Sequence, residues 1–418
     1  MESLEEIELR LVNKDPEQRI DALLDAWEYN TAGIELVVRA LEDKVRKVRQ
    51  SALLLLSESE TKIAKQALWN YLPFSQMQCL HTIIEFKFNS FDTKYYPDYF
   101  AIADYNNSLV CYSDVEYKRS GIAIYDLETG KAKTNHYLSM AHEFGLGKDG
   151  KVFVTSYQDF LQAYNLETLE GIYKFSDKQM NGSSPRKGEF TVCKKNFPLV
   201  AVCQAYSHGH RNNRNIIGFG EFEIWNYDTY DCLLHYEFED LLLFTSNRLS
   251  NIRTKSLEVF ISPLIFTPSG DFLIVRYMDR QKCCLVQIWN TDKLELVQTL
   301  ENLPRLTITS VGVRPNKTII ACGIREEKVC AWELQSDEII YTVSEMSPCI
   351  LSTDGRVLIY ATVKHEIVII DLVADRELVT LQGHKTAIAY LALSEDRQFL
   401  ASYSIDRQIK IWAIPDYS

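Results

Sequence analysis

The sequence predicts a mostly β fold, a seven-bladed β-propeller, preceded by a small all-α segment. Three observations lead to this prediction. One short pattern, in which alternating apolar residues lead to an aromatic residue and then to an acidic or amide turn residue, recurs seven times. Most recurrences are separated by the length of a four-stranded blade. Residues 3 to 72 lack the pattern and carry helix start and stop signals instead.

The seven copies of the pattern define one repeated position each. The copies read GIAIYDLETG (121 to 130), FLQAYNLETLEG (160 to 171), FEIWNYDTYD (222 to 231), VQIWNTDKLE (286 to 295), VCAWELQSDE (329 to 338), IVIIDLVADRE (367 to 377) and IKIWAIPD (409 to 416). The repeated positions are Tyr125, Tyr164, Trp225, Trp289, Trp332, Ile370 and Trp412. They are 39, 61, 64, 43, 38 and 42 residues apart. Four of these six intervals are close to the blade period of about 40 to 45 residues.

The residues around each copy complete a blade. Residues 308 to 345, for example, divide into four runs of alternating apolar residues separated by turn residues. Such strands are half-buried, so one blade has to stack on others. A closed ring of blades achieves this without an open sheet edge.

The stretch GHKTAIAYLALSEDRQFLASYSIDRQIKIW (383 to 412) resembles a complete WD40 repeat, with its Gly-His opening and an Asp six residues before the Trp. The resemblance implies a buried, hydrogen-bonded tetrad of His384, Ser402 (or Ser404), Asp406 and Trp412. We interpret this tetrad as structural, in preference to a catalytic His-Asp pair, because it satisfies the polar atoms of a buried imidazole and a buried indole. The other repeats lack this full set, and Ala413 follows the Trp here.

The resemblance also predicts how the ring closes. WD40 propellers complete their last blade with an N-terminal strand, and MQCLHTIIEFKF (77 to 88) is our candidate for that strand. We therefore expect a helical segment over residues 1–74 and the propeller over residues 75–418.

The helical segment shows a weak internal repeat. Asp15-Pro16 is a predicted N-cap and first helical position, Gly33 a predicted helix breaker, and Pro73 the end of the last segment. Two stretches align at an offset of 30 residues, with Arg19, Ala22, Leu23, Leu24 and Glu28 matching Arg49, Ala52, Leu53, Leu54 and Glu58. ALEDKVRKVRQSALLLLSES (40 to 59) resembles a HEAT-type repeat, which implies stacked helix pairs that bind proteins. The segment either caps the propeller or serves as a docking arm.

The composition narrows the function classes. A net charge of -12 argues against wholesale binding of nucleic acid or anionic membranes. We find no secretory signal and no membrane-spanning run, so we expect a cytoplasmic location. The ten cysteines are scattered without a CxxC pair, which predicts reduced thiols and neither a disulfide framework nor a metal site.

Two long insertions next to blade three are the candidate binding site. SHGHRNNRNIIGFG (207 to 220) joins the second and third strands of blade three, and EDLLLFTSNRLSNIRTKSLEVF (239 to 260) leads to blade four, so both are expected on one face of the ring. Basic residues are prominent in them and in the matching loop of blade four: His208, His210, Arg211, Arg214, Arg248, Arg253, Lys255, Arg280 and Lys282. We hypothesise a surface for an acidic or phosphorylated protein; the alternative is solvated loops without function. The His208-His210 pair has no third ligand nearby, so no metal is expected.

Catalytic motifs are missing from the sequence: we find no P-loop, GxGxxG, GxSxG or HExxH. The sequence therefore favours a non-enzymatic protein–protein interaction scaffold or adaptor that needs no cofactor. Two alternatives stay open at this point, a small-molecule-binding or hydrolytic propeller enzyme and a binder of nucleic acid or another polyanion. The partner's identity, the pathway and the oligomeric state do not follow from the sequence.

Overall fold

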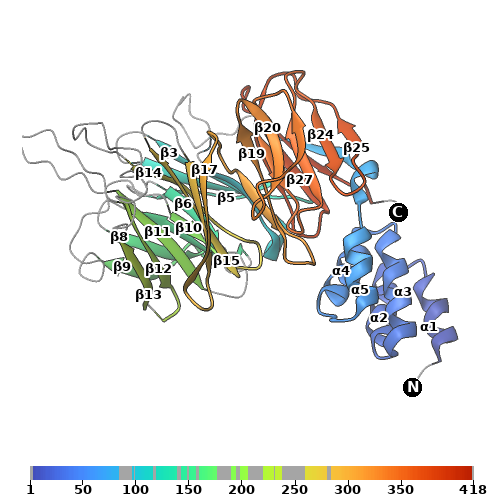
Figure 1. Ribbon diagram of the computed structural model, residues 1–418. Helices are drawn as coiled ribbons and strands as arrows, with labels where there is room; N and C mark the ends of the chain where they lie inside the picture. The colour runs from blue at the N-terminus through green and yellow to red at the C-terminus, as the bar shows by residue number, and fades with distance from the viewer. Residues whose placement is uncertain are drawn as a thin grey trace, which may run out of the picture. The chain divides into compact units, whose positions relative to one another are not determined.

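The computed structural model describes residues 3–83, 97, 99–115, 119–138, 143–147, 150–156, 160–176, 190–193, 198–205, 220–229, 231–237, 259–279 and 284–416. These residues contain seven four-stranded sheets and an N-terminal group of helices (Figure 1). The predicted fold class, a seven-bladed β-propeller behind a helical segment, is confirmed.

Each sheet is one blade with strands in meander order. Blade one contains β2 (Tyr99–Ala103), β3 (Ser108–Val115), β4 (Arg119–Asp126) and β5 (Ala132–Leu138). Blade two contains β6 (Glu143–Gly147), β7 (Val152–Ser156), β8 (Phe160–Asn165) and β9 (Gly171–Ser176). Blade three contains β10 (Phe190–Val192), β11 (Leu199–Ala205), β12 (Gly220–Asn226) and β13 (Cys232–Glu237). Blade four contains β14 (Val259–Phe266), β15 (Phe272–Asp279), β16 (Cys284–Asn290) and β17 (Glu295–Leu303).

The remaining three blades follow the same order, and the seventh includes a strand from the N-terminal side. Blade five contains β18 (Ser310–Val313), β19 (Ile319–Arg325), β20 (Lys328–Glu333) and β21 (Ile339–Val343). Blade six contains β22 (Cys349–Leu351), β23 (Val357–Ala361), β24 (Ile367–Asp371) and β25 (Arg376–Leu381). Blade seven contains β26 (Ile388–Leu393), β27 (Phe399–Ser404), β28 (Ile409–Ala413) and, next to β28, β1 (Gln78–Ile83).

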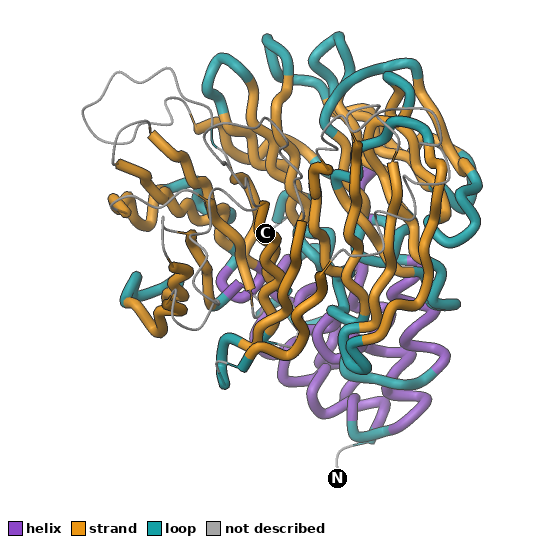
Figure 2. Tube along the Cα trace, turned by 60° about the vertical axis from the view of Figure 1, so that its left-hand side comes forward, coloured by secondary structure: helices purple, strands orange, loops and turns teal. Residues whose placement is uncertain are grey.

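The first strands of the blades form a closed ring. Each of them contacts the first strand of the next blade, from β2 through β6, β10, β14, β18 and β22 to β26, and β26 contacts β2. Successive strands within a blade are antiparallel neighbours joined by loops (Figure 2). Apolar side chains from facing blades fill the space between them, as the separate clusters of buried residues show. Ring closure thus covers both faces of every inner strand.

A β-bulge explains the repeated sequence position. In blades one to six the pairing of the third and fourth strands shifts register immediately before the repeated residue, for example between Ile224 and Trp225 and between Ala331 and Trp332. A bulge bends a strand and re-aims one side chain. Trp225, Trp332 and the Ile370 of blade six are all buried at this position.

The acidic or amide residue after the repeated position caps a tight turn. The Asp126 carboxylate accepts the Thr129 N–H at 2.8 Å, and the Asn226 side-chain oxygen accepts the Asp228 and Thr229 N–H groups at 2.9 and 3.0 Å. Asn165 and Asn290 do the same in blades two and four. These residues therefore serve turn geometry.

Five α-helices and a 3-10 turn form the N-terminal part of the described chain. They are α1 (Leu4–Leu11), α2 (Pro16–Trp27), α3 (Asn30–Arg39), η1 (Ala40–Glu42), α4 (Arg46–Ser57) and α5 (Lys62–Asn70), followed by η2 (Pro73–Gln76). As predicted, Asp15 caps α2, with its carboxylate accepting the Glu17 N–H at 3.0 Å and Pro16 in the first turn. Their HEAT-type character stays a prediction.

The prediction that Gly33 breaks a helix is wrong. The break falls at Tyr29 and Asn30, where Asn30 has a φ of 52°, and Gly33 lies inside α3. A Cβ at Gly33 would lie 1.7 Å from the carbonyl oxygen of Ala26 in α2. The glycine is therefore needed for the close approach of α3 to α2.

The matching arginines of the internal repeat are both buried. Arg19 is 3% exposed and donates to both carboxylate oxygens of Asp43, at 2.8 and 2.9 Å. Arg49 is 2% exposed and donates to the Asp43 carbonyl at 2.7 Å. Asp43, which lies between η1 and α4, therefore links the two helix pairs: its side chain binds Arg19 and its carbonyl oxygen binds Arg49.

Tertiary contacts divide the chain into two compact units. The first combines Met1–Thr82 with Ser394–Leu400 and Lys410–Ser418, and the second combines Ile83–Leu393 with Ala401–Ile409. The helices thus belong with two segments of the last blade. The division at residue 74 stays a prediction.

Candidate functional site

Two of the four predicted tetrad residues lie within hydrogen-bond distance in blade seven. His384 Nε2 lies 2.6 Å from Ser402 Oγ, and the exposed fractions of these residues are 9% and 0%. Ser404, the alternative serine, donates instead to Asp406. Trp412 is buried in β28. The His384–Ser402 contact joins the segment before β26 to β27, and the structural role of the tetrad stays a prediction.

The Asp406 carboxylate is held ionised beside this pair. Burial raises its pKa, but the hydroxyls of Ser404 and Thr386, the Gln408 N–H and the nearby His384 together lower the pKa below its usual value. Membership of Trp412 in the same network stays a prediction.

In blades three and four, the indole N–H of the repeated tryptophan donates to a side chain of its own strand. In β12, Trp225 Nε1 donates to Glu223 Oε2 at 2.8 Å, and Glu223 Oε1 lies 2.9 Å from Nδ1 of His235. In β16, Trp289 Nε1 donates to Gln287 Oε1 at 3.1 Å, and this oxygen also accepts the Tyr277 hydroxyl at 2.8 Å. The acceptor stands two residues before the tryptophan on the same strand in both blades. We did not predict it, although EIW and QIW in the repeat carry the signal.

All nine predicted partner-binding residues lie outside the described residues. They are His208, His210, Arg211, Arg214, Arg248, Arg253, Lys255, Arg280 and Lys282. The strand ends that flank them are described. Ala205 pairs with Gly220, Glu221 with Glu237, Val259 with Asp279 and Met278 with Cys284. Each of these ends lies where the second strand of a blade leads to the third, or where the fourth strand leads to the next blade.

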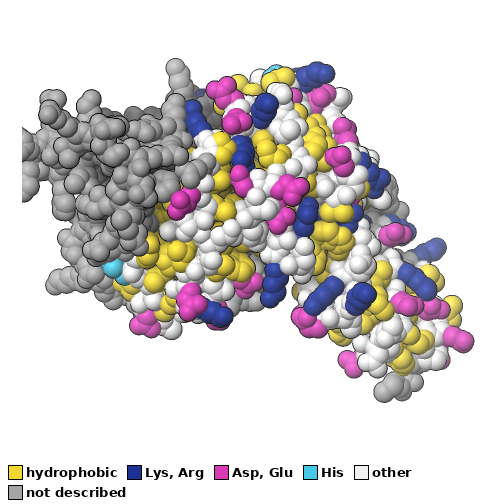
Figure 3. Space-filling model, viewed as in Figure 1, with side chains coloured by type: hydrophobic (Ala, Val, Ile, Leu, Met, Phe, Trp, Pro, Cys, Tyr) yellow, Lys and Arg dark blue, Asp and Glu magenta, His cyan; other side chains and the backbone are white. Residues whose placement is uncertain are grey.

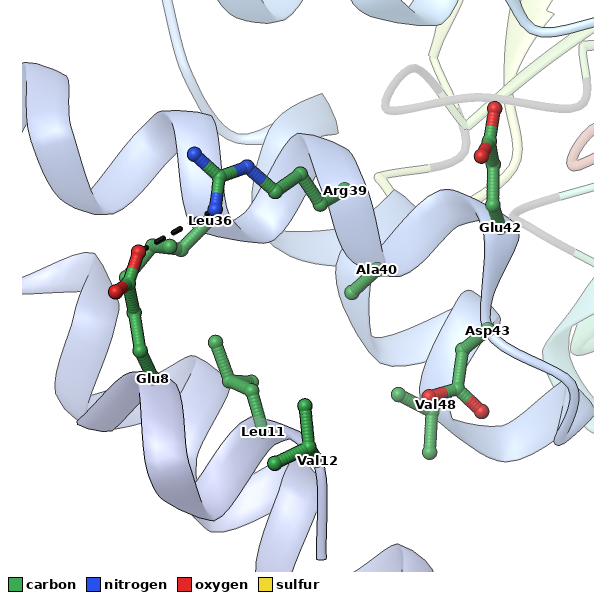
Figure 4. A pocket seen from close by; sticks show the side chains of 9 residues that line it. All are labelled: Glu8, Leu11, Val12, Leu36, Arg39, Ala40, Glu42, Asp43 and Val48. Atoms are coloured by element: carbon green, nitrogen blue, oxygen red, sulfur yellow. Dashed lines mark hydrogen bonds and ion pairs between the residues drawn. The ribbon is translucent and has the colours of Figure 1, made fainter. Parts of the chain in front are cut away.

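A pocket of about 390 Å³ in the helical part was not predicted from the sequence. It lies between α1 and the end of α3 (Figure 4) and is lined by Glu8, Leu11, Val12, Leu36, Arg39, Ala40, Glu42, Asp43 and Val48. Figure 4 shows the Glu8–Arg39 ion pair at one end, Glu42 and Asp43 at the other, and Leu11, Val12 and Ala40 between them. No local sequence pattern indicates this pocket, because α1 lies outside the aligned repeat.

Within the first unit, α4 contacts two segments of the last blade. Arg46 Nη2 donates to the Ile414 carbonyl at 2.9 Å, and its guanidinium lies 4.5 Å from the ring centre of Phe399. Arg49 Nε donates to Gln398 Oε1 at 3.1 Å. Gln398 also donates to the hydroxyl of Tyr71, whose pKa burial raises to about 12. These contacts join the helices to residues 398–414 within the first unit, and the choice between a cap and a docking arm stays a prediction.

Among the described residues, we find neither a patch of one charge on the face shown in Figure 3 nor a group of metal-binding side chains. On the face in Figure 3, acidic and basic side chains are interspersed over the described residues. The same part of the chain has no group of three His, Cys, Asp or Glu residues arranged for a metal ion, and eight of its cysteines are thiols outside any disulfide bond. Of the helices described, none is long and apolar enough to cross a membrane.

Comparison with known proteins agrees with the repeat pattern. Residues 375–413 match the family model of the WD domain, G-beta repeat. This match covers the segment 383 to 412 on which the predicted resemblance rests. No curated protein matches the chain. The chain thus contains one segment, from β25 of blade six through blade seven, that matches a WD domain repeat, within a seven-bladed β-propeller that N-terminal helices precede.

Proposed function

We propose that this protein is a non-enzymatic interaction scaffold that binds an acidic or phosphorylated protein segment at the basic connections of blades three and four. The fold is commonly used for protein–protein interaction. The observation that carries the proposal is the arrangement of the strand ends from which those connections leave.

The strand order supports a shared face for the connections. Because the strands of each blade are antiparallel, the end of the second strand, the start of the third and the end of the fourth lie at the same end of the sheet. Ala205, Gly220 and Glu237 are those ends in blade three. Val259 starts β14 of the neighbouring blade, paired with Asp279 at the end of β15. Residues 206–219, 238–258 and 280–283 therefore depart from one end of two adjacent sheets.

The charge of these connections supports an anionic partner. Arg211, Arg214 and Arg253 stand in segments of an otherwise acidic chain, whose net charge is -12. Arginine binds carboxylates and phosphates through two parallel hydrogen bonds, which gives geometric specificity. An acidic or phosphorylated segment is therefore the chemistry that these residues fit best.

Charge reversal tests the proposal. The triple variant Arg211→Glu, Arg214→Glu and Arg253→Glu is compared with the natural chain in affinity capture followed by mass spectrometry. A matched control carries Lys131→Glu, Lys293→Glu and Lys317→Glu, three exposed residues on turns at the opposite end of the sheets. We expect loss of the captured protein in the first variant and retention in the control. Retention in both would show that the binding face lies elsewhere.

Two further measurements separate the chemistries. Phosphatase treatment of the lysate abolishes capture of a phosphorylated partner and leaves an acidic one bound. Binding of polyanionic nucleic acid would fall steeply with salt, and strong binding of this kind without any protein partner would contradict the proposal. A cytoplasmic location is part of the same proposal and is tested by cell fractionation.

A further inference from the structure

The pocket between α1 and α3 has an apolar floor that the described residues leave uncovered. Leu36 and Val48 form its buried base, and Leu11 and Ala40 are half-buried above them. Val12, which follows α1, is 79% exposed at its edge. A volume of about 390 Å³ falls in the range of ligand pockets, roughly 300 to 1,000 Å³. It accommodates one large aliphatic side chain together with part of its backbone.

The charged residues of the pocket are three carboxylates and one guanidinium. Asp43 is already engaged, because it accepts two N–H groups from buried Arg19 and one from the Val45 backbone at 2.8 Å. It therefore supports the helices and is not free for a ligand.

The other carboxylates remain accessible to a ligand. Glu8 pairs with Arg39 at 3.3 Å, but both side chains are at least half exposed, so this pair contributes little and opens at small cost. Glu42 is exposed at the opposite end of the pocket. The pocket therefore favours a cation next to an apolar group.

A peptide fits this chemistry better than a small polar molecule does. Specific pockets for small ligands present several convergent polar groups. Among the nine lining residues, none has a buried side-chain polar atom without a hydrogen-bond partner. The charged side chains lie at the two ends of the pocket, with apolar side chains between them (Figure 4).

We propose that this pocket is a second protein-binding site, which takes a segment with a large aliphatic side chain next to Lys or Arg. The aliphatic side chain occupies the space above Leu36 and Val48, and the cation pairs with Glu42. The site does not depend on the proposed function of blades three and four, and its partner has the opposite charge.

The test uses the full chain and pools of acetylated, amidated hexapeptides with two fixed central positions. The fixed pairs are Leu–Arg, Leu–Glu and Ser–Arg. Binding is followed by methyl NMR with labelled Val and Leu. We expect the Leu–Arg pool to shift the methyl signals of Val12 and Leu11 and to leave those of Leu9 unchanged. Leu9 is 72% exposed on α1 but does not line the pocket, so it is an internal control.

Two variants have matched controls. Glu42→Arg should weaken binding of the Leu–Arg pool about fivefold, the factor for loss of one partly exposed charge pair, whereas Glu28→Arg, an exposed position outside the pocket with the same charge change, should not. Val12→Ser should weaken binding about threefold through lost apolar contact, and Leu9→Ser should leave it unchanged.

Several results would overturn the proposal. They are equal binding of the Leu–Arg and Leu–Glu pools, equal loss in Glu28→Arg and Glu42→Arg, or no shift at Val12 with any pool. Because all the variants change exposed residues, their melting temperatures report whether the helices remain folded. Failure here leaves the capture experiments on Arg211, Arg214 and Arg253 unaffected.

Discussion

Blades six and seven differ from blades three and four in how the same blade is held together. Blades six and seven have short connections, and a buried polar side chain just before one strand binds a side chain in another. Arg356, before β23, pairs with Asp371 at the end of β24 through two hydrogen bonds of 3.1 and 2.8 Å. In blade seven, His384 joins Ser402. These contacts tie separate strands together.

Blades three and four instead use an acceptor on the tryptophan's own strand, which also contacts His235 or Tyr277 on a neighbouring strand. Their tryptophans donate to Glu223 and Gln287, each two residues earlier in the same strand. Residues 206–219 of blade three are a long basic connection, and residues 238–258, which lead to blade four, are a long connection with three basic and three acidic residues. The difference teaches that blades three and four retain the four-stranded fold with longer connections, to which we assign partner binding as a proposal.

The largest expected effect follows from breaking the Arg356–Asp371 pair. The Arg356→Leu variant leaves a fully buried carboxylate without its cation, and removal of one partner of a buried pair costs about 3–5 kcal/mol. Denaturant unfolding of the variant measures the loss. Arg376→Leu, at an exposed position of the same blade, should change the free energy of unfolding by less than about 0.5 kcal/mol. Similar losses in the two variants would contradict the idea that the buried Arg356–Asp371 pair stabilises blade six.

Acid should weaken blades six and seven first. Burial raises the pKa of Asp371, but Arg356 and the Val373 and Ala374 N–H groups lower it below the usual value, and Asp406 is shifted in the same direction. A folded pKa below the unfolded value, about 3.9 for Asp, gives stability that is present above that pH and is lost as pH falls through the folded pKa. Melting curves between about pH 2 and 6 measure this loss.

The control for the acid effect is an Arg356→Leu, Asp371→Asn double variant. It lacks the titrating carboxylate and should lose less stability than the natural chain over the same pH range. If both proteins lose stability in parallel, Asp371 does not contribute to the acid transition.

Most of the fold could be predicted from local pattern. Period-two alternation and turn residues recur in every blade, and the bulge before the repeated residue in blades one to six makes that position recognisable even where Ile370 replaces an aromatic residue. The contacts that span the chain could not be predicted in this way. Arg46 of α4 donates to the Ile414 carbonyl, and no local pattern links positions so far apart.

Of the two candidate sites, one could be predicted from the sequence and the other depends on contacts between distant positions. The basic composition of residues 207 to 220 is visible in the sequence, because net charge needs no structure. The pocket beside α1 forms because α1 and α3 both pack on α2. That packing depends on tertiary contacts such as the close approach of Gly33 to Ala26. Its residues look individually like an ordinary helix surface.

A smaller effect is expected from separating His384 and Ser402. Either His384→Ala or Ser402→Ala leaves a buried partner without its hydrogen bond, which costs about 1–3 kcal/mol. Because the two side chains share one contact, the double variant should cost less than the two single variants combined. A thermodynamic cycle from denaturant unfolding measures the coupling. Additive losses would show that the pair contributes independently to blade seven.

The smallest effect on stability should come from blade three. Replacing residues 206–219 with seven Gly and Ser residues keeps Ala205 and Gly220 as paired strand ends and removes every basic residue between them. Halving a connection changes its closure cost by only about 0.6 kcal/mol, so the melting temperature should stay nearly constant. Partner capture should nevertheless be lost. A large loss of stability with this replacement would mean that the connection belongs to the fold of blade three, and the contrast with blades six and seven would then disappear.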